Sequence, residues 1–118
     1  MLAKTARVTT ADEYRSAVRR GARFSGPNTV TYVHREDSAG HRDGSPARFG
    51  FIVSKAVGVA VTRNRIRRRL KAVCYSLQST VEPGIDIVIR ALPSAATSSF
   101  ASLEREVTRS FAKAKVLS

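Results

Sequence analysis

The stretch Ser54–Leu77, SKAVGVAVTRNRIRRRLKAVCYSL, combines a dense run of positive charge with the apolar spacing of an α-helix. Between Arg63 and Lys71, six of the nine residues are Arg or Lys. Apolar side chains recur at steps of seven, four, three and four, which places them on one helical face: Val59, Ile66, Leu70, Val73 and Leu77. The pattern predicts a long helix that is docked by its apolar face and cationic on the other.

The basic side chains of this helix favour a polyanionic partner. Like charges at helical spacing destabilise a helix by roughly a few tenths of a kcal/mol per pair. No acidic residue occurs between Asp43 and Glu82 to offset this repulsion, whereas a merely soluble face would carry mixed signs. Arg63 and Arg69 are expected on the flanks of the apolar stripe, and the following residues are expected to point away from it: Asn64, Arg65, Arg67, Arg68 and Lys71.

The composition points to the same kind of partner. Among 118 residues, 21 are Lys or Arg and nine are Asp or Glu, so the net charge is +12, which suits nucleic acid or an anionic membrane. Nucleic acid is favoured, because the basic helix has no Trp or Phe on its apolar face and no apolar run approaches the ~20 residues of a membrane span. The single cysteine, Cys74, and the absence of a secretory signal core predict a cytoplasmic protein of one domain.

The rest of the chain predicts a two-layer α/β (α+β) sandwich. Thr10-Ala-Asp-Glu13 matches a capping box, so a first helix should run to about Arg20 and end at Gly21. The strand, basic helix and strand form a βαβ unit with parallel strands, and three helices should cover a four-stranded mixed sheet. The other expected segments are strands at 22–26, 29–33, 48–54 and 85–90, a polar loop at 34–47, and a last helix, capped by Ser98 or Ser99, that buries Phe100, Leu103, Val107 and Phe111.

No catalytic or metal-ligating constellation is found in the sequence. The nine acids are scattered, without the spacing or histidine partners of a two-metal nuclease. His34 and His41 fall in the polar loop and are interpreted as solvated residues. Asp86, in an apolar strand, is expected to pair with a basic residue of the helix or to meet the helix connection. Cys74 has no neighbouring general base, which indicates a buried structural thiol.

The remaining signal is a binding surface. Arg outnumbers Lys by five to one between Arg63 and Lys71, and guanidinium groups bind phosphates bidentately and stack on bases. Asn64 can hydrogen-bond to a base edge or a ribose hydroxyl. Three aromatic residues on or beside the sheet could offer stacking surfaces for single-stranded RNA, although each by itself is more often a core residue: Tyr14, Tyr32 and Phe51.

The run VSKAVGVAVTRNRIRRRLK, residues 53–71, resembles the signature of the protein subunit of bacterial ribonuclease P, with its RNR motif at Arg63-Asn64-Arg65. RVTTADEYRSAVRRG is similar to the first helix of that family, with Tyr14 at its usual Phe. PNTVTYV, FGFIVSK and DIVIRALPSAA are similar to its later strands and to the loop before the last helix. The resemblance implies one RNA-binding domain over residues 1–118, in the order α-β-β-β-α-β-α. It also implies a left-handed βαβ crossover, against the usual right-handed rule.

The resemblance also implies a function. In this family the RNA subunit is the ribozyme, which uses Mg²⁺ to cleave precursor tRNA at its mature 5′ end. The protein subunit binds that RNA through the motif helix and holds the single-stranded 5′ leader between its first helix and the sheet. We therefore expect one protein and one RNA per holoenzyme, a monomeric protein without membrane contact or organic cofactor, and a catalytic centre outside this chain.

Two groups of residues carry over by position. The expected contacts with the RNA subunit are Lys55, Arg63, Asn64, Arg65, Arg67, Arg68 and Lys71. The expected lining of the leader cleft is Tyr14, Val18, Val30, Tyr32 and Phe51. Three positions depart from the family pattern: Ala56 replaces a lysine, Val59 replaces a common Asn, and Val18 replaces a frequent aromatic. These departures weaken local polar contacts and stacking and leave the motif intact.

Three other classes of protein compete with this interpretation. A basic ribosomal or ribosome-assembly protein would share the charge and would need neither the motif nor an aromatic cleft. A DNA-binding domain would place the Arg-rich helix in the major groove and would usually dimerise. A stand-alone nuclease would need the acidic cluster that the sequence lacks.

Overall fold

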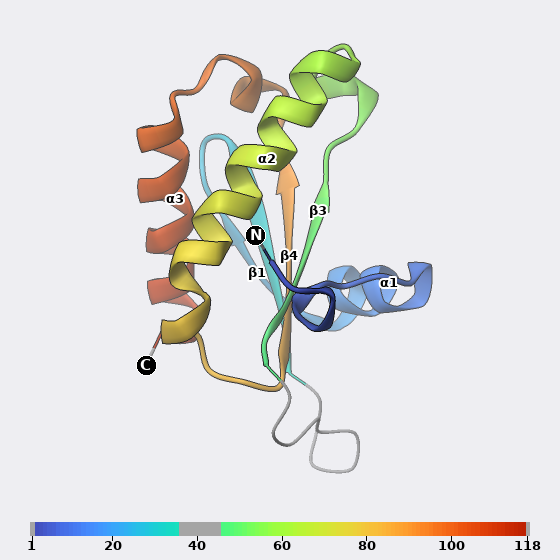
Figure 1. The fold of residues 1–118 in the computed structure, drawn as a ribbon, viewed down its shortest axis with the longest axis vertical. Coiled ribbons are helices and arrows are strands. Elements are labelled where there is room, and N and C mark those ends of the chain that lie inside the picture. The colour runs from blue at the N-terminus through green and yellow to red at the C-terminus, as the bar shows by residue number, and fades with distance from the viewer. Residues whose placement is uncertain (1, 36–45, 118) are drawn as a thin grey trace.

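The computed structural model describes residues 2–35 and 46–117, which contain three α-helices and one four-stranded sheet in the predicted order (Figure 1). The α+β fold class is therefore confirmed. The elements are α1 (Ala11–Arg20), β1 (Ala22–Ser25), β2 (Thr29–Arg35), β3 (Arg48–Ile52), α2 (Ala60–Leu77), β4 (Ile85–Ala91) and α3 (Phe100–Lys113). Four 3₁₀ turns join them: η1 (Lys4–Ala6), η2 (Lys55–Val57), η3 (Gln78–Thr80) and η4 (Pro93–Thr97).

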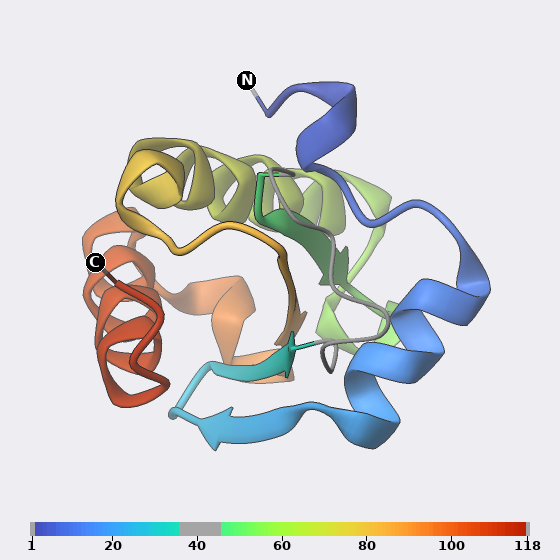
Figure 2. The same cartoon turned by 90° about the horizontal axis from the view of Figure 1, so that it is seen from below.

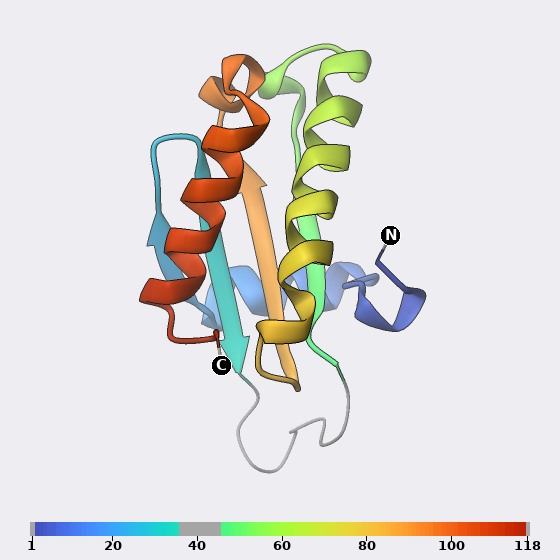
Figure 3. The ribbon, with the colours of Figure 1, turned by 60° about the vertical axis from the view of Figure 1, so that its left-hand side comes forward.

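The sheet is mixed and has the strand order β1-β2-β4-β3. Strand β3 pairs parallel with β4, as the βαβ pattern predicts, and the other two pairings are antiparallel. In Figure 3, β3 and β4 both run upward, α2 and α3 lie in front of the sheet, and β4 lies to the left of β3. This arrangement makes the crossover left-handed, as the family resemblance implies and contrary to the general rule.

The helices divide between the two faces of the sheet. Helices α2 and α3 pack side by side on one face (Figure 3), and α1 crosses the opposite face (Figure 2). The larger apolar core lies under α2 and α3, where the rings of Phe49 and Phe111 stack with their centroids 6.4 Å apart. A smaller cluster under α1 includes Ala17, Tyr32 and Val88.

Helix α1 begins and ends at the residues that the sequence predicts. The Thr10 hydroxyl accepts a hydrogen bond from the Glu13 amide at 3.1 Å, and the Glu13 carboxylate accepts one from the Thr10 amide at 3.1 Å. Gly21 ends the helix in an extended conformation. A Cβ atom at this position would lie 2.4 Å from the Ala17 carbonyl oxygen, so the close approach of the backbone requires glycine.

The apolar stripes of α2 and α3 are shorter than predicted. Ile66, Leu70 and Val73 are fully buried, but Val59 is 71% exposed, because it occupies the N-cap position before α2 begins. Phe100 is the first residue of α3 and is also exposed. In both helices the docked face begins after the first turn.

The segments around the long polar loop also differ from the prediction. His34 is not a solvated loop residue, because β2 continues to Arg35 and His34 is buried on it. The rest of the predicted loop, including His41, lies outside the described residues except for its end near Pro46. The segment after β4 was predicted as loop and contains the 3₁₀ turn η4.

Candidate nucleic-acid interface

Three arginines of α2 anchor the helix to neighbouring segments. Arg63 donates to the Gly58 carbonyl oxygen at 3.1 Å, which fixes the turn before the helix. Arg65 and Arg69 donate to the carbonyl oxygens of Ala96 and Ser98, at 2.9 and 3.0 Å. Arg65 is therefore half-buried against η4, whereas the helical spacing predicted it on the solvent face. These contacts hold α2 rigidly against the rest of the molecule.

The other polar residues of the motif form the outer face of α2. Arg67 donates to the Asn64 side-chain oxygen at 3.1 Å and to the Val53 carbonyl oxygen at 3.2 Å, so its guanidinium is held in place. Arg68 is exposed beside it. These residues line one groove together with Lys71, Ala72 and Tyr75. Because α2 contains no acidic residue, nothing within the helix neutralises this face.

A second groove lies between α1 and the edge of the sheet. It is lined by Tyr14, Arg15, Val18, Arg19 and Ile52. The ring of Tyr14 lies over the backbone of β3, where its hydroxyl oxygen accepts a hydrogen bond from the Phe51 amide at 3.2 Å. A Cβ atom at Gly50 would lie 2.7 Å from the ring, so α1 docks this closely only over a glycine.

Only two of the predicted cleft residues, Tyr14 and Val18, line this groove. Val30 and Tyr32 are each 4% exposed and belong to the core under α1. Phe51 packs against the larger core on the other side of the sheet, and its neighbour Ile52 lines the groove instead. Val30 and Tyr32 do face α1, as their assignment to the cleft requires, but the sequence did not tell which side chains α1 would cover.

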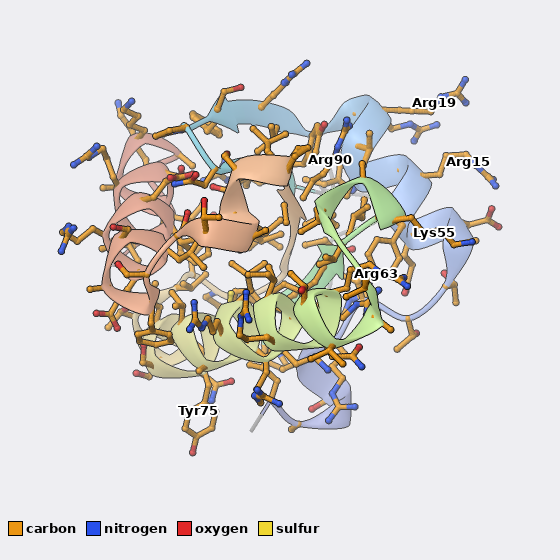
Figure 4. All side chains as sticks on the ribbon, turned by 90° about the horizontal axis from the view of Figure 1, so that it is seen from above. Arg15, Arg19, Lys55, Arg63, Tyr75 and Arg90 are labelled. Carbon is orange, nitrogen blue, oxygen red and sulfur yellow. The ribbon has the colours of Figure 1, made fainter. Side chains whose placement is uncertain are left out.

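Basic residues from separate elements surround the second groove. Figure 4 shows Arg15 and Arg19 of α1, Lys55 of η2, Arg63 of α2 and Arg90 of β4 on the same side of the molecule. The register places Arg90 beside Ile52 on the neighbouring strand, and Arg90 is exposed. Sequence reasoning missed Arg90, although a charged residue ending an apolar strand was a usable signal.

A half-buried ion-pair network joins α1 to the sheet beside this groove. Arg48 donates to both carboxylate oxygens of Asp86 at 2.9 Å, and it also pairs with Glu13. Asp86 pairs with a basic residue as predicted, but that residue lies on the neighbouring strand and not on the basic helix. Hydrogen bonding to Asp86 raises the pKa of Arg48, against the effect of burial. Burial alone would raise the pKa of Glu13, but the amides of residues 9 and 10 and the Arg48 guanidinium outweigh it and lower this pKa to about 2.

Neither groove carries the groups of a metal-dependent hydrolase. Within residues 2–35 and 46–117, no three His, Cys, Asp or Glu side chains gather as a metal site would require, so these residues do not fit a Mg²⁺ cage. Cys74 is buried as predicted, and burial raises the pKa of its thiol, which leaves it protonated at neutral pH. None of the helices in the described part of the chain is long and apolar enough to cross a membrane.

The fold and these surfaces define an α+β protein with a cationic crossover helix and a second, partly apolar basic groove. A family model described as Ribonuclease P matches residues 2–115. The ribonuclease P protein component of Clavibacter michiganensis subsp. michiganensis is 45% identical over 114 residues, which cover 97% of this chain and 96% of the relative. The corresponding protein of Mycobacterium avium is 38% identical over 109 residues, covering 92% and 91%. The chain belongs to the ribonuclease P protein family.

Solved structures of that family have the same fold. A Staphylococcus aureus RNase P protein superposes with a TM-score of 0.83 at 23% identity, covering 97% of this chain and 92% of that one. The Thermotoga maritima RNase P protein gives a TM-score of 0.72 at 16% identity, covering 87% and 92%. The family model and the curated relatives confirm the predicted family. This family associates the chain with a bacterial endoribonuclease of tRNA processing and with the ribonuclease P RNA.

Proposed function

We propose that this chain binds the catalytic RNA of ribonuclease P and the 5′ leader of precursor tRNA, and so promotes endonucleolytic removal of the leader. In this proposal the hydrolytic centre and its Mg²⁺ ions belong to the RNA. The observation that carries the proposal is the outer face of α2, which is rigidly anchored and has no acidic residue to neutralise it.

The outer face of α2 is suited to a folded RNA. Its guanidinium and ammonium groups would replace counterions on RNA phosphates, and the released counterions supply much of the binding free energy. Arg67 is already held by Asn64 and by the Val53 carbonyl, so little side-chain entropy is lost when it contacts a phosphate. Lys55 is exposed at the entry to the helix, on the side of the second groove (Figure 4).

The second groove is suited to a single strand of RNA. Tyr14, Val18 and Ile52 provide an apolar floor against which unpaired bases can pack. Arg15, Arg19 and Arg90 surround that floor and can contact the phosphates of the same strand. A leader bound here and a catalytic RNA bound on α2 would occupy different surfaces of one monomer, which fits one protein per RNA.

The salt dependence of RNA binding tests this proposal. The Arg68→Ala variant should bind the catalytic RNA of a bacterial ribonuclease P more weakly, and the slope of log affinity against log salt should fall by up to about one unit. Arg105→Ala is the matched control, because it removes an equally exposed arginine from α3. Equal affinities and slopes for the two variants would show that α2 is not the contact surface.

A further inference from the structure

The outer face of α2 carries an exposed aromatic residue that the motif does not include. Tyr75 is 49% exposed, whereas Tyr32 is buried and Tyr14 is half-buried over the sheet. Figure 4 shows Tyr75 pointing outward from the C-terminal half of α2, away from the basic residues around α1. It is not part of either apolar core, so packing within the molecule does not explain a large aromatic ring here.

The surroundings of Tyr75 form a cationic groove. Lys71 lies one helical turn before Tyr75 and Arg68 two turns before it, so the three side chains share one stripe of the helix. Ala72, three residues before Tyr75, is small and leaves space beside the ring. The groove has a volume of about 490 Å³ and is lined by Asn64, Arg67, Arg68, Lys71, Ala72 and Tyr75. Arg68 and Tyr75 are about 10 Å apart along the helix axis, at 1.5 Å per residue.

We propose that this groove is a stacking site for an unpaired nucleobase of the RNA partner. The ring of Tyr75 is the platform, and Arg68 and Lys71 hold the phosphates next to the stacked base. This inference rests on the proposed function and extends the RNA-binding surface along α2 beyond the motif, to a residue that contributes no charge.

Charge complementarity selects RNA as the occupant. The groove combines three basic side chains with an aromatic ring, and α2 contains no acidic residue. An apolar protein segment would have to desolvate those cations without pairing them, which is costly. A nucleotide satisfies both parts of the groove, because it presents a flat base to the ring and a phosphate to the cations.

Substitution of Tyr75 tests the stacking directly. With the catalytic RNA of a bacterial ribonuclease P as the probe, Tyr75→Ala should weaken binding about 5- to 100-fold, and Tyr75→Phe should bind normally because it keeps the ring. The salt slope should be unchanged in both variants, since stacking releases no counterions. Phe100→Ala is the control, because it removes an exposed aromatic from the start of α3.

The outcomes separate this inference from the proposed function. Normal RNA affinity in Tyr75→Ala, combined with weak binding by Arg68→Ala, would overturn the stacking site and leave the proposed function standing. A Tyr75→Ala defect that Phe does not rescue would also overturn it, since a ring would then not be sufficient. If Tyr75→Ala binds the RNA normally and differs from the unsubstituted chain only in self-association, the groove is a contact between two copies of the chain and the stacking site is overturned.

A fluorescent reporter gives a second test that does not depend on affinity. The chain contains no Trp, so Tyr75→Trp introduces a single tryptophan at the groove, which can be excited selectively over the two remaining tyrosines. Stacking on a base should quench this fluorescence when the same RNA is added. Phe100→Trp, on α3, should keep its fluorescence. RNA binding without quenching of the Trp at position 75 would contradict the stacking site.

Discussion

Arg48 ties α1 to the sheet through two carboxylates. Its guanidinium bridges a carboxylate on the adjacent strand and a carboxylate on α1, because the register places it opposite Asp86 and the end of the capping box lies above it. Asp86 is 5% exposed, and carboxylate oxygens so far from water need hydrogen-bond donors within the protein. Glu13 therefore has two roles, since it caps α1 and ties the helix to the sheet.

Removal of the Arg48 side chain should be costly. The Arg48→Ala variant loses both hydrogen bonds to a buried carboxylate, and we expect its free energy of unfolding to fall by about 3 kcal/mol in urea titrations. Arg15→Ala removes an exposed pair with Asp12 and should cost less than about 1 kcal/mol. Similar losses in the two variants would mean that the Arg48 network is not a structural determinant.

The capping carboxylate should make the stability depend on acid pH. The pKa of Glu13 is about 2 in the folded protein and about 4.5 without these partners, so the folded state favours the ionised form. Its contribution is complete above about pH 4.5 and is lost as the pH falls towards 2. Glu13→Gln should therefore be less stable than the unsubstituted chain at pH 7, and the difference should disappear only below pH 2, where the carboxyl group is protonated in the folded protein as well. A stability difference between the two proteins that stays constant from pH 7 to below pH 2 would contradict this role of the Glu13 carboxylate.

At the scale of elements, the docking of α1 sets the shape of the second groove. The Tyr14 ring lies directly over Gly50, and the apolar floor of the groove is completed by Val18 and Ile52. Helix α2 packs on the opposite face of the sheet and is held by its own contacts with the turn before it and with η4, which follows β4. The two proposed RNA surfaces therefore depend on different sets of contacts.

Substitution of Gly50 should affect RNA binding in the second groove and leave binding on the outer face of α2 unchanged. In Gly50→Ala the new Cβ atom would lie 2.7 Å from the Tyr14 ring, so the ring and α1 must move, at a cost of about 1–3 kcal/mol in thermal unfolding. We expect weaker binding of a single-stranded leader oligonucleotide and unchanged affinity for the catalytic RNA. Equal losses for both ligands would contradict the assignment of the leader to this groove.

Local patterns predicted the elements well, whereas their mutual placement needed the structure. The capping box of α1 and the stripe of α2 depend on residues three or four apart, so the sequence shows them directly. The pairing of Arg48 with Asp86 joins residues 38 apart, and no local pattern indicates it. Likewise, the choice of Ile52 over Phe51 for the groove depends on which face of the sheet α1 covers.

At the scale of the whole molecule, the left-handed crossover could not be predicted from hydrophobic periodicity, which is the same for either hand. The family resemblance supplied it, and the position of α2 relative to the parallel strands β3 and β4 confirms it (Figure 3). With this topology α2 lies on one face of the sheet and α1 on the other (Figure 2), and both helices carry exposed arginines, such as Arg68 on α2 and Arg15 on α1. We infer that the cations of the protein screen the phosphate charges of a large RNA and of a bound leader at the same time.

The most direct test is cleavage of precursor tRNA by the catalytic RNA of a bacterial ribonuclease P at low Mg²⁺, with and without this protein. The protein alone serves as the control. We predict cleavage at the mature 5′ end only when both components are present, because the cations of the protein replace part of the Mg²⁺ that screens the phosphates. Cleavage by the protein alone, or RNA binding that never promotes cleavage, would contradict the proposal.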